Sequence, residues 1–248
     1  MRVVLKRSHE LFVARVSGRK IPVVIKRNSR ARRLILRIDE ALGLPVITIP
    51  SRMALTKGED FLRENLHWVE NRLSRISPAV PFSDGGVFPL RGAPCRIVHS
   101  GGRGLIEVKR EPGGWVLTVP GQPEFLIRRV TEWLKREARR DLEAAVAKHG
   151  RALGRRPSAV RIGDAKSRWG SCSAGGVLTF SWRLVLAPPF VLDYLAAHEV
   201  AHLREMNHGP RFWAWLDRLE PDHVVARDWL QRESPKLSAI GRPLDRWL

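Results

Sequence analysis

Cysteine is scarce in this chain of 248 residues. Cys95 and Cys172 are the only two, they lie far apart in the sequence, and neither belongs to a CxxC pair. A disulfide framework and a cysteine-based zinc site both need more cysteines at closer spacing, so neither is expected. The sequence therefore fits a reducing compartment, and we expect a cytoplasmic protein.

Long apolar runs are missing as well. Near the N-terminus, Lys6, Arg7 and Arg15 interrupt the apolar residues, which argues against a signal peptide. The most apolar later stretch, residues 184–203, carries an aspartate, a glutamate, two histidines and two prolines, which a bilayer core would not accept. We therefore expect neither export nor a membrane span.

Acidic residues are few relative to basic ones: 25 Asp plus Glu stand against 44 Lys plus Arg, and the formal net charge is +19. A basic surface attracts phosphate polyanions, so nucleic acid, nucleotides and acidic proteins are candidate partners. The densest basic group consists of Lys26, Arg27, Arg30, Arg32, Arg33 and Arg37. A solvated sheet face is the favoured interpretation of this group, because charge alone assigns no site.

The hydrophobic pattern predicts a mixed α+β protein. Residues 21–50 contain three β-type runs, and residues 55–76 carry apolar residues at helical spacing. The same order follows in the next part of the chain, with three β-type runs within residues 95–120 and a helix over residues 124–153. A hydrophobic content of 44% and a charged content of 28% are typical of globular proteins.

The two successive parts resemble one another. ITIP, ending at Pro50, matches LTVP, ending at Pro120, and each precedes a helix that bears a tryptophan, so an internal duplication is one hypothesis. SPAVPFSDGG, residues 77–86, is the predicted linker. We predict an N-terminal β-rich module that ends in a helix over residues 1–78, and a second β-meander with the catalytic core over residues 79–248.

The C-terminal part has a different pattern. Residues 159–162 and 177–186 are predicted strands on either side of the SRWGSCSAGG turn region, and Pro188–Pro189 opens a long helix. Further helices are predicted over residues 210–219 and from residue 223 to about residue 232.

The long helix contains HEVAH, an HExxH pattern. Each helical residue turns the side chain by about 100°, so His198 and His202 face the same way and can share one metal ion. Glu199 lies beside them, angled toward the remaining coordination position. A zinc ion with three protein ligands and one water is the catalytic arrangement, and Glu199 is then the predicted base that takes a proton from the zinc-bound water. The surrounding apolar residues bury this helix, where such groups are costly without a metal partner.

His208 is the predicted third ligand, six residues past His202. In a continuous helix it would point away from the metal, so the helix must end between the two histidines. Asn207 suits a left-handed or capping conformation, and Gly209–Pro210 marks a break and restart. The spacing equals the metzincin HExxHxxGxxH, but Glu205 stands where that family has glycine, which argues against a metzincin.

Three segments, SRWGSCSAGGVLTFSWRLVLAP, DYLAAHEVAHL and NHGPRFW, resemble the YgjP-like metallopeptidase domain family, which is related to the WLM and SprT-like groups. A weaker resemblance extends to RNSRARRLILRID and ITIP, so most of residues 21–236 are covered. The resemblance implies a zincin-like core at about residues 154–236, with zinc on His198, His202 and His208 and with Glu199 as base. A nucleotide pyrophosphatase activity has also been ascribed to the family, so peptide and nucleotide substrates both stay open.

Other residues near the motif have two interpretations each. The resemblance places Arg168 and Trp169 near the metal, as a wall or an anion contact for substrate; the alternative is a tight turn fixed by Gly170. Tyr194 lies one helical turn before His198 and could stabilise an oxyanion, although packing is favoured. Elsewhere, packing under the site is predicted for Phe212, Trp213 and Trp215. His223 could support a ligand, although a capping or exposed position is favoured.

The sequence thus predicts an α+β protein with a zincin-like catalytic core that carries the HExxH helix, preceded by a β-rich N-terminal region with long helices. The favoured function is a zinc metallopeptidase whose peptide or protein substrate lies along residues 177–186. One alternative is a metal-dependent nucleoside triphosphate pyrophosphatase. Another is a basic DNA-associated module with a structural zinc, which would need a fourth protein ligand. No cofactor besides Zn²⁺ is predicted.

Overall fold

The computed structural model describes residues 3–6, 9–16, 19–39, 44–74, 77, 79–164 and 168–242. The chain forms two compact units, Pro81–Gly241 and Met1–Val80 with Arg242–Leu248, and each has a hydrophobic core of its own. The fold is mixed α+β, as predicted, whereas the predicted domain boundary between residues 78 and 79 stays a prediction. Among the described helices, none has both the length and the apolar character to cross a membrane.

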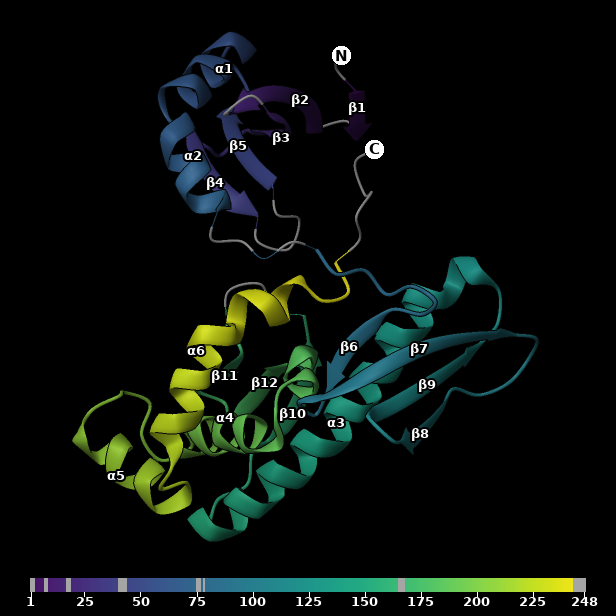
Figure 1. Ribbon diagram of the computed structural model, residues 1–248. Helices are drawn as coiled ribbons and strands as arrows, with labels where there is room; N and C mark the ends of the chain where they lie inside the picture. The colour runs from purple at the N-terminus through teal and green to yellow at the C-terminus, as the bar shows by residue number, and fades with distance from the viewer. Residues whose placement is uncertain are drawn as a thin grey trace. The chain divides into compact units, whose positions relative to one another are not determined.

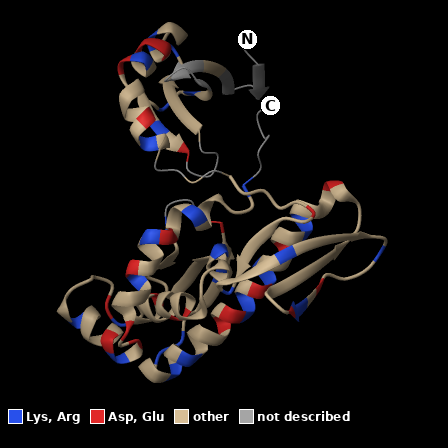
Figure 2. Ribbon diagram, in the orientation of Figure 1, with Lys and Arg blue, Asp and Glu red and all other residues tan. Residues whose placement is uncertain are grey.

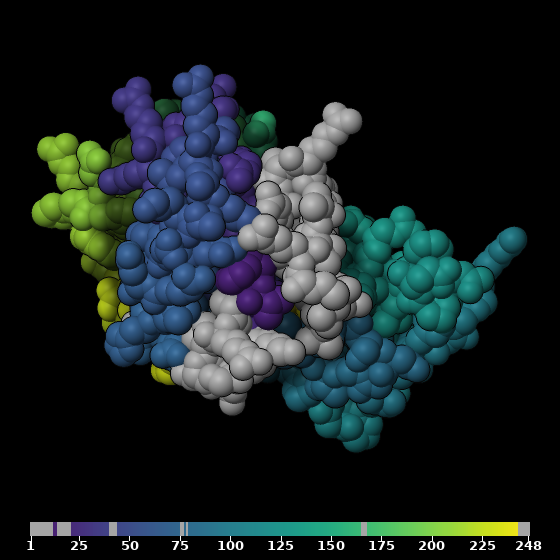
Figure 3. Space-filling view, turned by 90° about the horizontal axis from the view of Figure 1, so that it is seen from above, coloured from purple at the N-terminus to yellow at the C-terminus, as the bar shows by residue number. Residues whose placement is uncertain are grey.

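The first unit is a sheet with two helices. Its elements are β1 (Val3–Lys6), β2 (His9–Val16), β3 (Arg19–Asn28), β4 (Ile35–Asp39), β5 (Leu44–Pro50), α1 (Leu55–Glu64) and α2 (Leu66–Leu73). The sheet order is β1-β2-β3-β5-β4, with β3 and β5 parallel and the other pairs antiparallel. Val23, Ile25, Ile47 and Ile49 face Leu62 of α1 in the core. The side chains of α1 and α2 (blue) form a continuous surface in Figure 3.

The predicted helix over residues 55–76 is divided in the structure. Asn65 separates α1 from α2, because its φ of −110° and ψ of 16° leave the helical region. Its side-chain Nδ2 instead donates a hydrogen bond to the Phe61 carbonyl at 2.8 Å. Asparagine competes with the backbone for hydrogen bonds in this way, which explains the break. Residues 75 and 76 lie outside the described residues.

The second unit contains two sheets and the longer helices. Its elements are β6 (Val87–Leu90), β7 (Ala93–Gly101), β8 (Glu107–Glu111), β9 (Gly114–Pro120), the 3₁₀ helix η1 (Pro123–Phe125), α3 (Leu126–Leu153), β10 (Ala159–Gly163), β11 (Gly170–Cys172), β12 (Val177–Ser181), the 3₁₀ helix η2 (Trp182–Leu186), α4 (Pro189–Ala201), α5 (Pro210–Leu219) and α6 (His223–Ala239). The sheets have the orders β6-β7-β9-β8 and β10-β12-β11. Figure 1 shows α3 extending from the first of these sheets to the helices α4–α6.

The resemblance between the two parts of the chain extends to their strand topology. In the first sheet, β2-β3-β5-β4 has one parallel pair, β3 with β5, flanked by antiparallel pairs. In the second, β6-β7-β9-β8 has the same order and the same directions. Pro50 ends β5 and Pro120 ends β9, and each strand is followed by helical structure. This agreement supports the duplication hypothesis.

Three predicted elements of the C-terminal part differ from the structure. Residues 177–186 were expected to form one strand, but β12 ends at Ser181, whose side chain accepts a hydrogen bond from Arg183 N and caps η2. The predicted turn region contains β11, which pairs antiparallel with β12. The last helix continues through Pro235 to Ala239, beyond the predicted end near residue 232.

Helix α3 is the scaffold of the second unit. It packs against α4, η2 and β10 through a buried apolar stripe that includes Leu134, Leu142 and Val146. Its exposed face carries both signs of charge (Figure 2), including the Arg139–Glu143 ion pair at 3.1 Å. The helix ends at Gly154, whose φ of 67° is the left-handed conformation that favours glycine.

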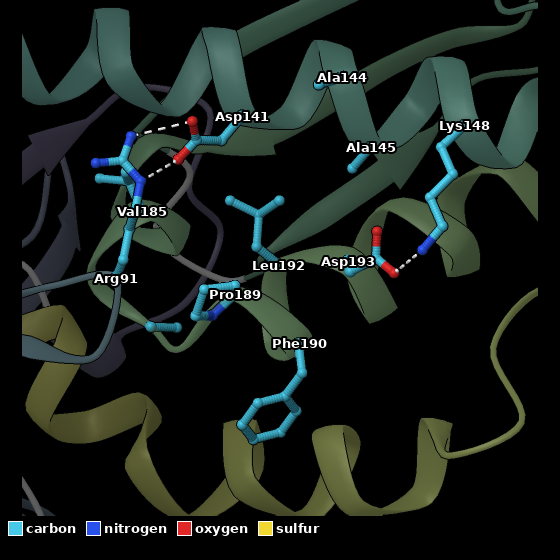
Figure 4. A pocket seen from close by; sticks show the side chains of 11 residues that line it. Arg91, Asp141, Ala144, Ala145, Lys148, Val185, Pro189, Phe190, Leu192 and Asp193 are labelled. Atoms are coloured by element: carbon cyan, nitrogen blue, oxygen red, sulfur yellow. Dashed lines mark hydrogen bonds and ion pairs between the residues drawn. The ribbon is translucent and has the colours of Figure 1, made fainter.

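The turn between β6 and β7 ties the first sheet of this unit to the helices. Arg91 and Gly92 have φ of 50° and 78°, as in the two-residue turns of tight hairpins. Arg91 N donates to the Val185 carbonyl at 2.8 Å. The Arg91 guanidinium contacts Asp141 of α3 at 2.7 Å and Glu137 of α3 at 2.8 Å (Figure 4 shows the Asp141 pair). All three side chains are at most 24% exposed, so these ion pairs are shielded from solvent.

Replacing Arg91 with alanine should lower the free energy of unfolding of the second unit by about 1–3 kcal/mol, because Glu137 and Asp141 would lose a part-buried charge partner. Denaturant unfolding followed by circular dichroism measures this loss. Arg139→Ala is the matched control: it removes an ion pair whose side chains are 50% exposed, and it should cost less than about 0.5 kcal/mol. Equal losses in both variants would contradict the stabilising role of Arg91.

Candidate metal centre

Helix α4 is buried on nearly every side. Pro189 occupies its first turn, as predicted, and apolar side chains surround its axis. The buried apolar residues are Val191, Leu192, Tyr194, Leu195, Ala196, Ala197, Val200 and Ala201. The helix packs against α3, α5, α6, η2 and β11. Ionisable side chains on such a helix need partners, because burial without them costs several kcal/mol.

The helix ends at Ala201, and His202 is its C-cap. The backbone tightens there into i→i−3 hydrogen bonds, since Leu203 N donates to Val200 O at 2.9 Å and Arg204 N donates to Ala201 O at 3.0 Å. The expected end of the helix between His202 and His208 is therefore present. The chain then turns back toward the helix.

The turn uses a different conformation from the one predicted. Asn207 is not left-handed, because Arg91 is the one non-glycine with positive φ in the described part of the chain. Gly209 is the N-cap of α5 with φ of −85°, and Pro210 is the first helical residue. The Trp213 indole nitrogen donates to the His208 carbonyl at 3.0 Å and so anchors the turn to α5.

Three imidazoles meet at this turn. One ring nitrogen from each of His198, His202 and His208 lies within 4.8 Å of the other two. The Nε2 atoms of His198 and His208 are 3.1 Å apart. The Nδ1 atom of His202 lies 3.0 Å from the Glu205 carbonyl, which can only accept, so Nδ1 carries the proton and Nε2 keeps its lone pair. The exposed His208 leaves the group open to solvent.

Phe212 lies beneath the three imidazole rings. It is fully buried, and its ring centroid lies 4.9 Å from that of His198, 4.5 Å from His202 and 4.6 Å from His208. Packing under the site was predicted for Phe212, but the sequence did not indicate that one ring would contact all three histidines. The side chain of Phe212 therefore fixes the positions of the imidazoles relative to one another.

The side chain of Glu199, a residue of α4, lies against β11. It is 4% exposed, and its Oε2 atom is buried with no hydrogen-bond partner among the described residues. Burial raises the pKa of Glu199 to about 7, and the charge of Arg168 opposes this shift. A Cβ atom placed on Gly170 would lie 2.8 Å from Glu199 Cγ and 2.9 Å from Cδ, so any larger residue would displace the Glu199 side chain from this position.

The remaining candidate residues surround this group in different ways. Arg168 is exposed, near enough for its charge to act on Glu199. Trp169 packs toward α6, where its indole nitrogen donates to Ser234 Oγ at 2.8 Å. The Tyr194 ring is 5% exposed and lies 5.9 Å from the His198 ring. The roles of Arg168, Trp169 and Tyr194 in binding substrate stay predictions.

His223 is a residue whose position the sequence analysis misjudged. A capping or exposed position was favoured over a role in supporting a ligand, but His223 is 7% exposed and its Nε2 lies 2.8 Å from Asp217 Oδ1. Its ring stacks on Tyr194 at 6.5 Å and on Trp213 at 5.8 Å. No motif spacing marks it, because the rings of His223, Tyr194 and Trp213 come together only when α5 and α6 fold against α4.

The donor set fits a transition-metal ion. Burial, followed by the neighbouring His202, His208 and His223, lowers the pKa of His198 to about 3, and burial also lowers the pKa of His202. Both imidazoles are therefore neutral at neutral pH, as metal ligands must be. Two ring nitrogens that face each other at 3.1 Å need a proton or a cation between them.

Comparisons with known proteins identify the family. No curated protein matches this sequence. Among solved structures, the chain is similar to the metallopeptidase zymogen of Pyrococcus abyssi abylysin, with 24% identity over 39% of this chain and 94% of that one. The TM-score of 0.34 is too low to establish a shared fold. The family model described as YgjP-like, metallopeptidase domain matches residues 32–233, and the chain therefore belongs to this family of metallopeptidase domains.

Proposed function

We propose that this protein is a zinc-dependent metallopeptidase in which His198, His202 and His208 hold the metal and Glu199 is the catalytic base. One observation carries the proposal: three imidazole nitrogens lie within 4.8 Å of one another, beside a buried glutamate. The bound metal supplies a Lewis acid that polarises a carbonyl group and lowers the pKa of water. Membership of a metallopeptidase family supports the reaction class.

The donor types favour zinc, and the number of donors favours catalysis. Imidazole suits zinc and related transition metals better than magnesium or calcium. Within the described part of the chain, the cluster consists of three imidazoles with no fourth histidine, cysteine or carboxylate. A structural zinc would require four protein ligands. The open position therefore argues for a hydrolase rather than for the alternative of a DNA-associated module with a structural zinc.

Glu199 has the properties of a general acid–base group. A pKa of about 7 allows the carboxylate to take a proton from water at neutral pH and the carboxylic acid to pass it to the leaving amine. Gly170 lets the backbone of β11 approach this side chain closely. The carboxylate is thereby held between α4 and the first residue of β11.

The sheet suggests where an extended substrate lies. The sequence analysis placed the substrate along residues 177–186, but β12 pairs with β10 on one side and β11 on the other, so it has no free backbone edge. Among the strands that the structure describes, β11 lies at the edge of the sheet β10-β12-β11. Extended peptides bind by adding a strand to such an edge. We therefore assign the substrate to β11, next to Glu199.

Separate losses of metal and turnover test the assigned roles. Glu199→Gln should keep its zinc but lower peptidase turnover at least about 100-fold, because the proton acceptor is gone. His202→Ala should lose both zinc and turnover, because a ligand is missing. Metal analysis of the purified variants and a peptidase assay measure the two effects. Full activity in Glu199→Gln would end the role proposed for this residue.

The close approach of Gly170 gives a second test. Gly170→Ala should displace the Glu199 carboxylate and lower turnover about 100-fold while the zinc content stays unchanged. Gly175→Ala is the matched control, since a Cβ atom there would meet nothing nearer than Ser173 Oγ at 3.9 Å. Normal activity in Gly170→Ala would show that the carboxylate needs no such space.

The nucleotide pyrophosphatase alternative stays a prediction, and the net charge of +19 together with Arg168 beside Glu199 favours it. The zinc-loaded protein should cleave unfolded protein substrates, and a chelator should abolish this activity because it removes the metal. Nucleoside triphosphates, incubated in parallel with and without chelator, should remain intact. Chelator-sensitive hydrolysis of nucleotides alone would replace the peptidase proposal with the alternative.

A further inference from the structure

A stack of three rings lies beside the three imidazoles. His223 of α6 is its middle member, with Tyr194 of α4 on one side and Trp213 of α5 on the other. The outer ring centroids lie 6.5 Å and 5.8 Å from that of His223, and the ring planes differ by 20° and 27°. These distances are within the range of interacting aromatic pairs. Each ring thus comes from a different helix, and α4 packs against both α5 and α6 (Figure 1).

The two outer rings of this stack each contact one imidazole of the candidate metal centre. The Tyr194 ring centroid lies 5.9 Å from that of His198. The Trp213 ring centroid lies 6.0 Å from that of His208, and the Trp213 indole nitrogen also donates to the His208 carbonyl. His198 and His208 are the two residues whose Nε2 atoms face each other at 3.1 Å. The stack therefore extends from one of these histidines to the other, and His223 separates its two ends.

A carboxylate holds one edge of the His223 ring. The Nε2 atom lies 2.8 Å from Asp217 Oδ1, and because an ionised carboxylate can only accept a hydrogen bond, Nε2 carries the proton. Asp217 belongs to α5, one helical turn after Trp213. The hydrogen bond therefore fixes the orientation of the imidazole relative to the helix that carries Trp213.

The other edge of the ring shows that packing alone does not account for an imidazole at this position. His223 is 7% exposed, and its Nδ1 atom is buried with no hydrogen-bond partner among the described residues. A buried polar atom without a partner lowers stability. A phenylalanine would fill the stack without this cost. The hydrogen bond to Asp217 is what the imidazole adds, and its effect is to orient the ring.

We propose that His223, held by Asp217, is a positioning residue for the metal centre. Its ring keeps Trp213 in place, and Trp213 holds the His208 backbone through the carbonyl. His208 is the exposed member of the three imidazoles and lies beyond the end of α4, so its position depends on this support. The proposal rests on the assignment of the three imidazoles as metal ligands. Helix α6 supplies none of these imidazoles, yet through His223 it determines how tightly the metal is bound.

Zinc affinity, measured on the full-length protein by competition with a chelator, tests the role of the ring. His223→Ala should raise the zinc dissociation constant about 10-fold, because Trp213 and His208 lose their support. His223→Phe should keep the melting temperature of the metal-free protein but recover only part of the zinc affinity, since the ring is present and the hydrogen bond is not. Val225→Ala removes an exposed side chain from the same turn of α6 and is the matched control, which should bind zinc as the wild type does.

Substitutions of Asp217 test the hydrogen bond. Asp217→Ala should raise the zinc dissociation constant about 3-fold, the effect of one hydrogen bond. Adding Asp217→Ala to His223→Phe should cause no further loss, because both changes remove the same interaction. Asp217→Asn should bind zinc almost as the wild type does, since its amide oxygen still accepts from Nε2.

The absorption spectrum of the Co²⁺-substituted protein separates positioning from a loss of stability. It should change in His223→Ala and His223→Phe, because the ligand geometry around the ion changes. Wild-type zinc affinity and a wild-type Co²⁺ spectrum in His223→Phe would overturn the proposal, even if His223→Ala failed to fold. Additive losses in the double variant would overturn the role of the hydrogen bond. Failure of the proposed metal site gives a different result: the wild type then binds no zinc, or His202→Ala binds it equally well.

Discussion

Burial of α4 is the constraint on which the rest of the second unit depends. The helix is apolar on almost every side, so α3, α5, α6, η2 and β11 must all pack around it. Its few polar side chains are buried or half-buried, and each lies against a specific neighbour. Asp193 faces the imidazole of His149, Glu199 lies against the backbone of Gly170, and His198 and His202 meet His208. This burial lowers the pKa of His198 and of His202, and it raises the pKa of Glu199 to about 7.

The grouping of the three imidazoles also depends on where the helix ends. Had α4 continued past His202, His208 would point away from the other two rings. Backbone hydrogen bonds end the helix, and the Trp213 indole holds the returning chain at His208. Phe212 then sets the spacing of the three rings from below. The turn and the start of α5 therefore position the three imidazoles together.

Local patterns in the sequence were sufficient to predict the HEVAH helix and the helix that follows it. The Pro189 start and the bounds of α5 are as predicted, because proline chemistry and helical periodicity are local properties. Strand β11 was missed since its three residues are too few to show alternation. The break at Asn65 was also missed, because an asparagine within an otherwise helical pattern has no obligatory effect. Contacts between distant segments, such as His223 with Tyr194 and Gly170 with Glu199, leave no local pattern at all.

The repeated strand order has a consequence for how the protein tolerates change. Both β2-β3-β5-β4 and β6-β7-β9-β8 follow one plan, yet the buried residues of the two units form separate clusters. In the first unit the following helices complete the core of their own sheet, whereas in the second α3 packs against α4, η2 and β10. A destabilising amino-acid replacement in one core therefore lowers the free energy of unfolding of that unit. The three imidazoles and Glu199 belong to the second unit, so replacements in the core of the arginine-rich first unit leave their immediate packing unchanged.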